Sequence, residues 1–284
     1  MSEKCKYVAI DGTEIRFGED GKLFMGQGDL RSYSWIVNSP YGYISSFGKD
    51  DVVTKNGTIY ISGSIDEVKN TANQILSIFE KDIRYKNEHP YSNETGRLYI
   101  GGCYLKCFIT SSTPSAYLTH RHFLKKDITL VTDSPEWIKE VTSSFSNIIE
   151  STGTKKYPYK YPYTYRSNIN SEIINNDFAV SSNFEVIIEP SPGHSSANPF
   201  FEIGSRNYRF NITLQEGEKL KINSLAKAIL KIDAAGNETD VLYVRNKEYD
   251  VFAKIPSGEH MISVSDNALI TITLLQERSE PEWI

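Results

Sequence analysis

From residue 183 to residue 275 the chain alternates short apolar-patterned segments with turn sequences such as SPGH, QEGE, AAGN and PSGE. Segments that recur at roughly 8–12-residue intervals are typical of antiparallel strands in a β-sandwich or jelly roll. We therefore expect an all-β second domain. Its nine expected strands are NFEVIIEP (183–190), FFEIG (200–204), NYRFNITL (207–214), EKLKINS (218–224), KAILKID (227–233), TDVLYV (239–244), YDVFAKI (249–255), HMISVS (260–265) and ALITITLL (268–275).

The first half of the chain is also β-patterned, and it contains dipeptides that favour turns. Asp11-Gly12 and Asn56-Gly57 tolerate positive φ at both positions, so each predicts a two-residue hairpin turn. Gly101-Gly102 predicts a bulge or bend within a strand. The expected hairpins cover 7–17 and 51–63, the bent strand covers 97–112, and further strands cover 29–37 and 123–132; 133–140 fits either a helix start or an extended segment, and 143–156 a connector or weak strand.

In one segment of the first half, the apolar residues have helical periodicity instead of strand alternation. In SIDEVKNTANQILSIFEKDI, residues 64–83, apolar side chains recur at helical spacing. Ser64 and Glu67 form the S-x-x-E signature of a capping box, in which two backbone amides at a helix start find side-chain acceptors. We expect a helix whose buried face consists of Val68, Ala72, Ile75, Leu76, Phe79 and Ile83.

Length and charge limit the possible classes of protein. A chain of 284 residues predicts two domains of ordinary size. The net charge of −5, with basic runs only in RHFLKK (121–126) and KK (155–156), argues against nucleic acid binding. No stretch approaches the 18 apolar residues of a membrane helix, and MSEKCKYVAI lacks the apolar core of a secretory signal. We expect a protein made and kept in a cytoplasm, which fits its three cysteines.

Two pairs of side chains resemble metal ligands. Cys103 and Cys107 would share one face of a strand, but a structural zinc site needs a second ligand pair, which the sequence lacks. His120 and His122 would also share a face, and no acidic or cysteine partner follows them at ligand spacing. We expect buried or idle thiols at the two cysteines and a solvated strand end or loop at the two histidines, and therefore no metal site.

The sequence predicts neither catalysis nor a cofactor. Nucleophile elbows, phosphate-binding loops and dinucleotide fingerprints are absent from it. The carboxylates of Asp50, Asp51, Glu136 and Glu140 are scattered in a pattern typical of exposed positions. Two carboxylates for glycoside hydrolysis could meet only through the fold.

The segment KYPYKYPYTY, residues 156–165, has a tyrosine at every second position. In an extended chain all five rings face one way and could stack on sugar rings. Its prolines fix φ and remove amide donors, which excludes a central strand. Between a sugar-binding strip, a strand and a stiff joint between domains, we favour the joint, formed by Tyr157, Pro158, Tyr159, Tyr161, Pro162, Tyr163 and Tyr165.

Four stretches are similar, in their order along the chain, to the distal tail protein family of long-tailed phages, the siphophages. The order covers nearly the whole chain, so the protein resembles a phage tail component of the baseplate hub. The four stretches are FMGQGDLRSYSWIVNSPYGYISSFG (24–48), ITLVTDSPEWI (128–138), YPYKYPYTY (157–165) and FFEIGSRNYRFNITLQEGEKLKIN (200–223).

The resemblance implies a mainly β protein with three parts. An N-terminal β-sandwich or split-barrel domain with one helix and hairpins, over 1–150, would form a ring. A Tyr/Pro-rich joint over 151–166 would lead to a C-terminal galectin-like β-sandwich, or jelly roll, over 167–284. The end of the chain, LLQERSEPEWI, either folds back on the first domain or forms a free tail.

The resemblance also implies a structural role without enzymatic activity. Six copies would form a ring at the virion tail tip, assembled in the bacterial host cytoplasm, through which DNA leaves. The implied partners are further copies of the chain, the tail-tube protein, the tape-measure protein, the tail-associated lysin, receptor-binding or baseplate proteins and, in some relatives, a cell-surface saccharide. Two other classes stay open: a carbohydrate-binding protein that uses the sandwich or the tyrosines, and a hydrolase of cell-wall or capsule polymers.

Overall fold

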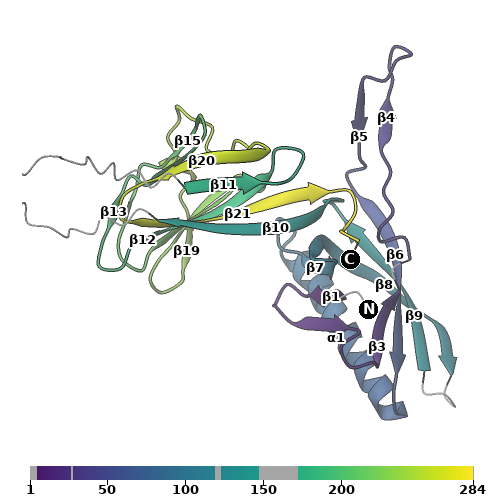
Figure 1. Cartoon of the computed structure of the whole chain (residues 1–284). Coiled ribbons are helices and arrows are strands. Elements are labelled where there is room, and N and C mark those ends of the chain that lie inside the picture. The colour runs from purple at the N-terminus through teal and green to yellow at the C-terminus, as the bar shows by residue number, and fades with distance from the viewer. Residues whose placement is uncertain (1–4, 27, 119–122, 147–171, 284) are drawn as a thin grey trace, which may run out of the picture. The chain divides into compact units, whose positions relative to one another are not determined.

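The computed structural model describes residues 5–26, 28–118, 123–146 and 172–283, and it is mainly β, as expected (Figure 1). Contacts between residues group the chain into two compact units. The first is Met1–Lys139 with Glu277–Ile284, and the second is Glu140–Gln276. The division into 1–150, 151–166 and 167–284 stays a prediction, because the expected joint falls within 147–171, outside the described residues.

Two antiparallel sheets of the first unit share one long strand, β8 (Cys103–Leu118). The first part of β8 pairs with its neighbours in one sheet, and the part beyond Phe108 pairs with β9 in the other. One sheet has the order β10 (Trp137–Ser146), β8, β7 (Gly96–Ile100), β1 (Cys5–Val8) and β2 (Glu14–Phe17); the other has β8, β9 (Phe123–Thr132), β6 (Val53–Ser62) and β3 (Leu23–Gly26).

Helix α1 (Ile65–Glu88) contacts β8 and β6 and begins where the sequence predicts. The Glu67 amide donates to the Ser64 hydroxyl at 3.3 Å, and the Ser64 amide donates to the Glu67 carboxylate at 2.7 Å, which completes the capping box. Leu76 was wrongly expected in the core: it is 41 % exposed, since it lies about 100° around the helix from buried Ile75. The buried residues of α1 are Val68, Ile75, Ile78, Phe79 and Asp82.

The hairpin expected around Asn56-Gly57 is wrong, because β6 is one continuous strand that pairs with β9 along its length. A Cβ atom at Gly57 would lie 3.4 Å from both the Gly26 carbonyl oxygen and a methyl carbon of Leu30. The Asn56-Gly57 dipeptide therefore lies inside a strand and forms no turn, and a Cβ atom at 57 would make ordinary van der Waals contacts.

The strand expected over 29–37 is also wrong for most of its length. Residues 28–31 form a turn in which the Asp29 amide donates to the Asn56 carbonyl at 3.1 Å. Of the expected strand, Ile36 and Val37 alone are paired, in β4 (Ile36–Asn38), whose partner is β5 (Ser46–Gly48). The chain turns here because Gly28 adopts φ +52° and lies against the Asn56 backbone. This backbone conformation ends the extended chain that precedes it.

The other two turn dipeptides lie in hairpins. Asp11-Gly12 lies between β1 and β2 as expected, although the connection runs over 9–13 and is longer than two residues. Gly101-Gly102 is the two-residue connection between β7 and β8, with φ of +59° and +77° at its two positions. Two positive φ values define a tight hairpin turn, so the expected bulge or bend is a complete reversal of the chain.

The second unit is a β-sandwich, as the strand spacing predicts. The first sheet runs β19, β18, β17, β12, β21 and β10, and the second runs β11, β20, β14 and β15. β13 and β16 form a separate, two-stranded antiparallel sheet. The bounds are β11 (Glu172–Asn176), β12 (Asn183–Pro190), β13 (Ser196–Ala197), β14 (Phe200–Ile203), β15 (Arg206–Arg209), β16 (Thr213–Leu214), β17 (Lys219–Asn223), β18 (Ala228–Ile232), β19 (Glu238–Asp240), β20 (Gly258–Val264) and β21 (Ala268–Arg278).

Three aromatic rings join the two sheets of the sandwich. Phe184 on β12 meets Tyr208 on β15 edge-on at 5.4 Å between ring centroids, and Tyr208 stacks on Phe201 of β14 at 4.4 Å. All three side chains are fully buried. Ring pairs in these geometries stabilise a core beyond the area that they bury, by about 0.5–1.5 kcal/mol each.

Three expected strands of the sandwich are wrong or divided. The segment expected over 207–214 is divided into β15 and β16, which lie in different sheets. Residues 249–255 form turns, because the Asp250 side chain accepts from the Phe252 amide at 3.1 Å and the Ala253 amide donates to the Asp250 carbonyl. Val251 and Ile255 are still buried, so a loop inserts them into the core. The segment expected over 239–244 is split into β19 and a short 3₁₀ helix (Leu242–Val244).

Candidate assembly surface

A hairpin arm, residues 33–48, extends from the first unit and contains β4 and β5 (Figure 1). Every residue from 33 to 47 is exposed. Eight of them are large apolar or aromatic residues, and their exposed fractions range from 44 to 78 %. They are Tyr33, Trp35, Ile36, Val37, Tyr41, Tyr43, Ile44 and Phe47.

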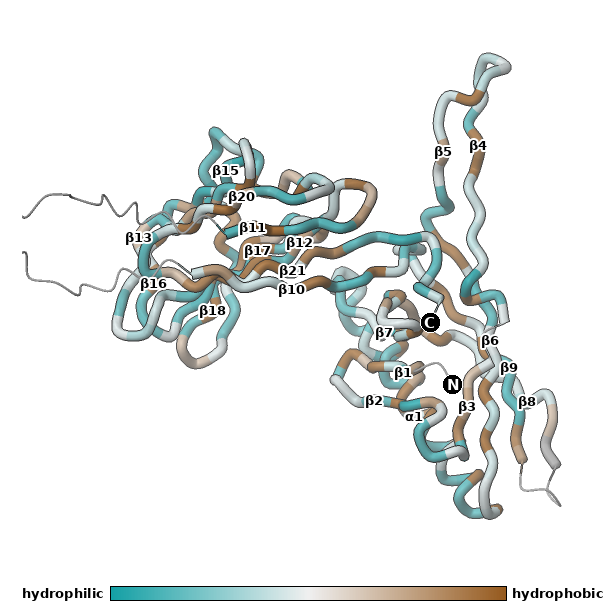
Figure 2. Tube along the Cα trace, viewed as in Figure 1, coloured by the Kyte–Doolittle hydropathy of each residue, from teal (hydrophilic) through white to brown (hydrophobic). Residues whose placement is uncertain are grey.

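The arm is held together by its own short-range contacts. Val37 faces Phe47 across the strand pair, and the Asn38 side chain donates to the Ser46 hydroxyl at 3.1 Å. The rings of Tyr41 and Tyr43 stack at 6.2 Å near the tip. An isolated two-stranded hairpin is marginal in water, and exposed apolar clusters on soluble proteins mark interaction sites. Figure 2 shows the hydrophobic stretch that β4 contributes to this arm.

Side chains brace the root of the arm, defined as residues 29–32 and 49–55. Lys55 is 5 % exposed, and its ammonium group donates to the Ser32 carbonyl. Burial is the main cause that lowers the pKa of Lys55, opposed by nearby Asp29. Asp29 in turn accepts from the Asn56 backbone amide and, at 3.1 Å, from its side chain. These bonds fix the turn from which the chain enters the arm.

Lys49 holds the segment through which the chain leaves the arm. Its ammonium nitrogen lies 3.3 Å from a carboxylate oxygen of Glu136 and 4.6 Å from the centroid of the Trp35 ring. A hollow of about 220 Å³ lies at the root. Its lining includes Lys49, Lys55, Asp50 and Pro135. Both ammonium groups in the lining have protein partners, and the contact of Lys55 joins the two sides of the root.

A second hairpin, formed by β8 and β9, extends from the same unit. Its pairing shifts register between Ile109 and Ser111 and again between Pro114 and Ala116. Bulges of this kind, and a proline within a strand, twist and protect an edge. Residues 119–122, which include His120 and His122, lie outside the described residues.

The structure buries both β8 thiols. Cys103 and Cys107 are 0 % and 1 % exposed, and burial raises the pKa of the Cys107 thiol to about 12. None of the three cysteines forms a disulfide, and the Cys5 thiol donates to the Met25 sulfur at 3.4 Å. Over the described ranges, no group of three or more His, Cys, Asp and Glu side chains could hold a metal ion.

The scattered carboxylates do not form a site. Glu136 is half-buried against Lys49, whereas Asp50, Asp51 and Glu140 are exposed. Each joint residue, from Tyr157 to Tyr165, lies outside the described residues. Within the described part of the chain, no helix is long and apolar enough to cross a membrane.

The sequence prediction missed the arm as a separate feature. Four of its eight large side chains fall within the strand expected over 29–37, and the other four lie in no expected strand or helix. Gly, Ser and Pro interrupt these residues, and no strand or helix period continues from 33 to 48. The available signal was this combination of high aromatic content with absent periodicity.

No family model and no curated protein matches the chain. The crystal structure of SPP1 Dit (gp 19.1), described as a paradigm of the hub adsorption apparatus in phages that infect Gram-positive bacteria, matches with a TM-score of 0.55 and 9 % identity, over 96 % of this chain and 99 % of that chain.

Two structures of the phage p2 baseplate in its activated conformation also match. The strontium-bound structure gives a TM-score of 0.60 and 12 % identity, over 98 % of this chain and 99 % of that chain. The calcium-bound structure gives the same score and identity, over 99 % and 100 %. The chain therefore has, over nearly its whole length, the fold of phage distal tail hub and baseplate proteins.

Proposed function

We propose that this chain is a structural subunit of a phage tail tip, where six copies close into a ring between the tail tube and the distal tail and host-adhesion apparatus. The observation that carries the proposal is the arm: eight exposed large side chains on a hairpin, in a fold shared with hub and baseplate proteins. The role is one of assembly and not of catalysis.

The arm supplies what a cyclic assembly needs. A ring forms when one patch of each subunit binds a different patch of the next, with a rotation that closes. Burying the exposed half of each large arm side chain contributes roughly 1 kcal/mol, so eight together can offset the entropy lost on association. The arm's projection from the unit lets it reach a neighbouring copy.

The charge of the chain suits a conduit for DNA. With a net charge of −5 per chain, a ring of six copies carries −30. A basic lumen would retain DNA through release of counterions, whereas an acidic ring does not hold it. Further proposed partners are the tail-tube, tape-measure, tail-associated lysin and receptor-binding or baseplate proteins, and the proposed location is the virion tail tip.

Photo-crosslinking tests the role of the arm. A photoreactive phenylalanine analogue at Tyr41, which is 78 % exposed, is compared with the same analogue at Tyr91, which is 97 % exposed and belongs to the same unit. The expected result is a ladder of covalent multimers from position 41, up to six chains, and monomers from position 91. Monomers from both positions, alone and with a tail-tube protein added, contradict the proposal.

A further inference from the structure

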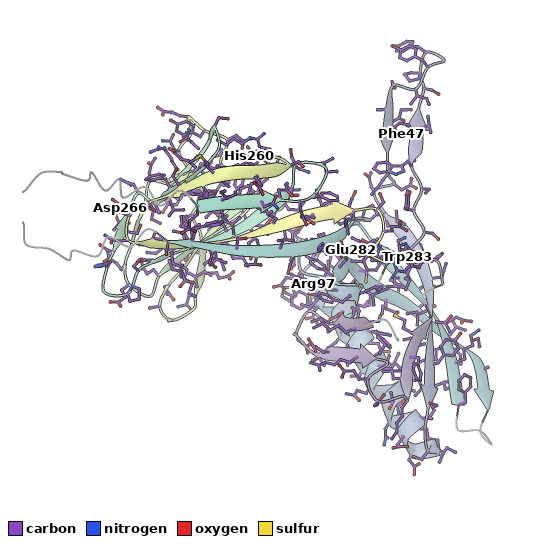
Figure 3. All side chains as sticks on the ribbon, in the orientation of Figure 1. Phe47, Arg97, His260, Asp266, Glu282 and Trp283 are labelled. Atoms are coloured by element: carbon purple, nitrogen blue, oxygen red, sulfur yellow. The ribbon has the colours of Figure 1, made fainter. Side chains whose placement is uncertain are left out.

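The last residues of the chain belong to the first unit, although they follow the final strand of the second. Residues Glu277–Ile284 group with Met1–Lys139, and the labels of Glu282 and Trp283 lie near the root of the arm in Figure 3. Their contacts there involve Arg31, the residue between buried Leu30 and exposed Ser32. The C-terminal segment thus meets the chain at the point where the core ends and the arm begins.

Arg31 holds the C-terminal segment through both terminal nitrogens and one face of its guanidinium group. One terminal nitrogen donates to the Pro281 carbonyl at 3.1 Å and to the Glu282 carbonyl at 3.3 Å, and the other donates to the Glu282 carbonyl at 3.4 Å. The guanidinium carbon lies 4.0 Å from the centroid of the Trp283 ring. Arg31 is 9 % exposed, whereas Trp283 is 74 % exposed, so the ring covers the guanidinium from the solvent side.

A second set of contacts, made by the Glu282 side chain, holds the same segment. The Glu282 carboxylate accepts from Lys139 of β10 at 2.9 Å and from Arg278 of β21. The hydrogen bond from Lys139 is the largest cause that lowers the pKa of Glu282, followed by Arg278. Charge-assisted bonds of this kind are roughly twice as strong as neutral ones.

From these contacts we infer that residues 281–283 are a latch that sets the position of the arm, with Arg31 and Trp283 as its positioning residues. The inference rests on the proposed function, since a positioned arm matters because the arm assembles the ring. A short two-stranded hairpin has little rigidity of its own, and its direction depends on the root. At Arg31 the C-terminal segment contacts that root, next to the Ser32 carbonyl that Lys55 binds.

Backbone amides at the root report directly on the latch. The Ser32 amide donates to the Asp29 carbonyl at 2.9 Å, and the Asp29 amide donates to the Asn56 carbonyl. Both exchange with solvent only when the root opens locally. If the latch restrains the root, its loss must accelerate exchange at residues 29–32 and leave the exchange of α1 unchanged.

The test is hydrogen–deuterium exchange on the full chain, comparing Trp283→Ala and Arg31→Lys with wild type. Trp283→Ala removes the stacked ring and should speed exchange at 29–32 by roughly two- to fivefold. Arg31→Lys keeps the charge but loses the planar fork that reaches two carbonyls, so it should speed exchange by roughly tenfold. Tyr91→Ala, a change of an exposed aromatic residue in the same unit, is the control and should change nothing.

The outcomes separate the latch from the proposed ring. Unchanged exchange at 29–32 in Trp283→Ala, a surface variant that leaves the core intact, overturns the latch. Faster exchange at 29–32 together with an unaltered thermal midpoint supports it. Exchange is measured on the dilute chain and does not depend on assembly, so a chain that responds in this way yet never multimerises keeps the latch and loses the ring.

Discussion

The Tyr7 hydroxyl donates to the Asp82 carboxylate at 2.6 Å, inside the core between β1 and α1. Both residues are almost fully buried, and the other carboxylate oxygen accepts from the Ile10 amide at 3.1 Å. Tyr7→Phe leaves Asp82 with one partner fewer in a dry site and should lower the free energy of unfolding by about 1–3 kcal/mol. Urea denaturation measures this, with Tyr91→Phe as the exposed control; equal stability of the two variants would refute the role of the bond.

Asp82 also predicts a pH dependence. Burial is the largest cause that raises the pKa of Asp82 above its ordinary value, so the folded chain holds this proton more tightly than the unfolded chain. Its contribution to stability is therefore fully present below the unfolded-state pKa of about 3.9 and is lost as the pH rises through the folded-state pKa.

A variant that cannot titrate isolates this effect. The free energy of unfolding of wild type minus that of Asp82→Asn should fall as the pH rises from about 3.5 to neutrality. Carboxylates with lowered pKa, such as Glu67, occur in both proteins and cancel in the difference. Urea titrations across this range measure it, and a difference that grows with pH would show that the pKa of Asp82 is lowered.

Two glycines separate backbone strain from steric collision. Gly28 has φ +52°, and a Cβ there would lie 2.3 Å from the Asn56 carbonyl oxygen; Gly12 has φ +83° with nothing within 4 Å. Gly12→Ala should cost only the left-handed backbone term, about 1–2 kcal/mol. Gly28→Ala should cost clearly more, since the root turn must also move. Thermal midpoints rank the two, and an equal loss would mean that the root tolerates the collision.

Thiol labelling tests the packing of β8. In the native protein we expect one equivalent to react with an aromatic disulfide reagent, at half-buried Cys5, because Cys103 and Cys107 are almost fully buried. The other two should react only after unfolding. Cys5→Ser should abolish native labelling, and bound zinc or rapid reaction of three thiols would contradict this packing.

Elements with strong local signals were predicted from the sequence. The capping box places the start of α1 at Ser64, and alternation places β9 and β12 within the expected ranges 123–132 and 183–190. In each case the forces that select the element act between residues that are close in the sequence.

The failures depend on residues that are distant in the sequence. Gly57 resembles a turn residue although β6 continues through it in pairing with β9, and Val251 resembles a strand residue although a loop carries it into the core. Phe47 of the arm is 58 % exposed, yet it has the same side chain as Phe79 of the core, which is 3 % exposed. Sequence patterns report burial preference, and they do not say which chain provides the burial.

The measurement that tests the ring most directly is the absolute mass of the purified protein by light scattering after size exclusion, followed by negative-stain imaging. We predict a mass of six times 32.2 kDa and ring-shaped particles, with a shift to the mass of one chain when Val37 and Phe47 are both replaced by Ser. A wild-type mass of 32.2 kDa at every concentration, alone and with a tail-tube protein, would contradict the ring.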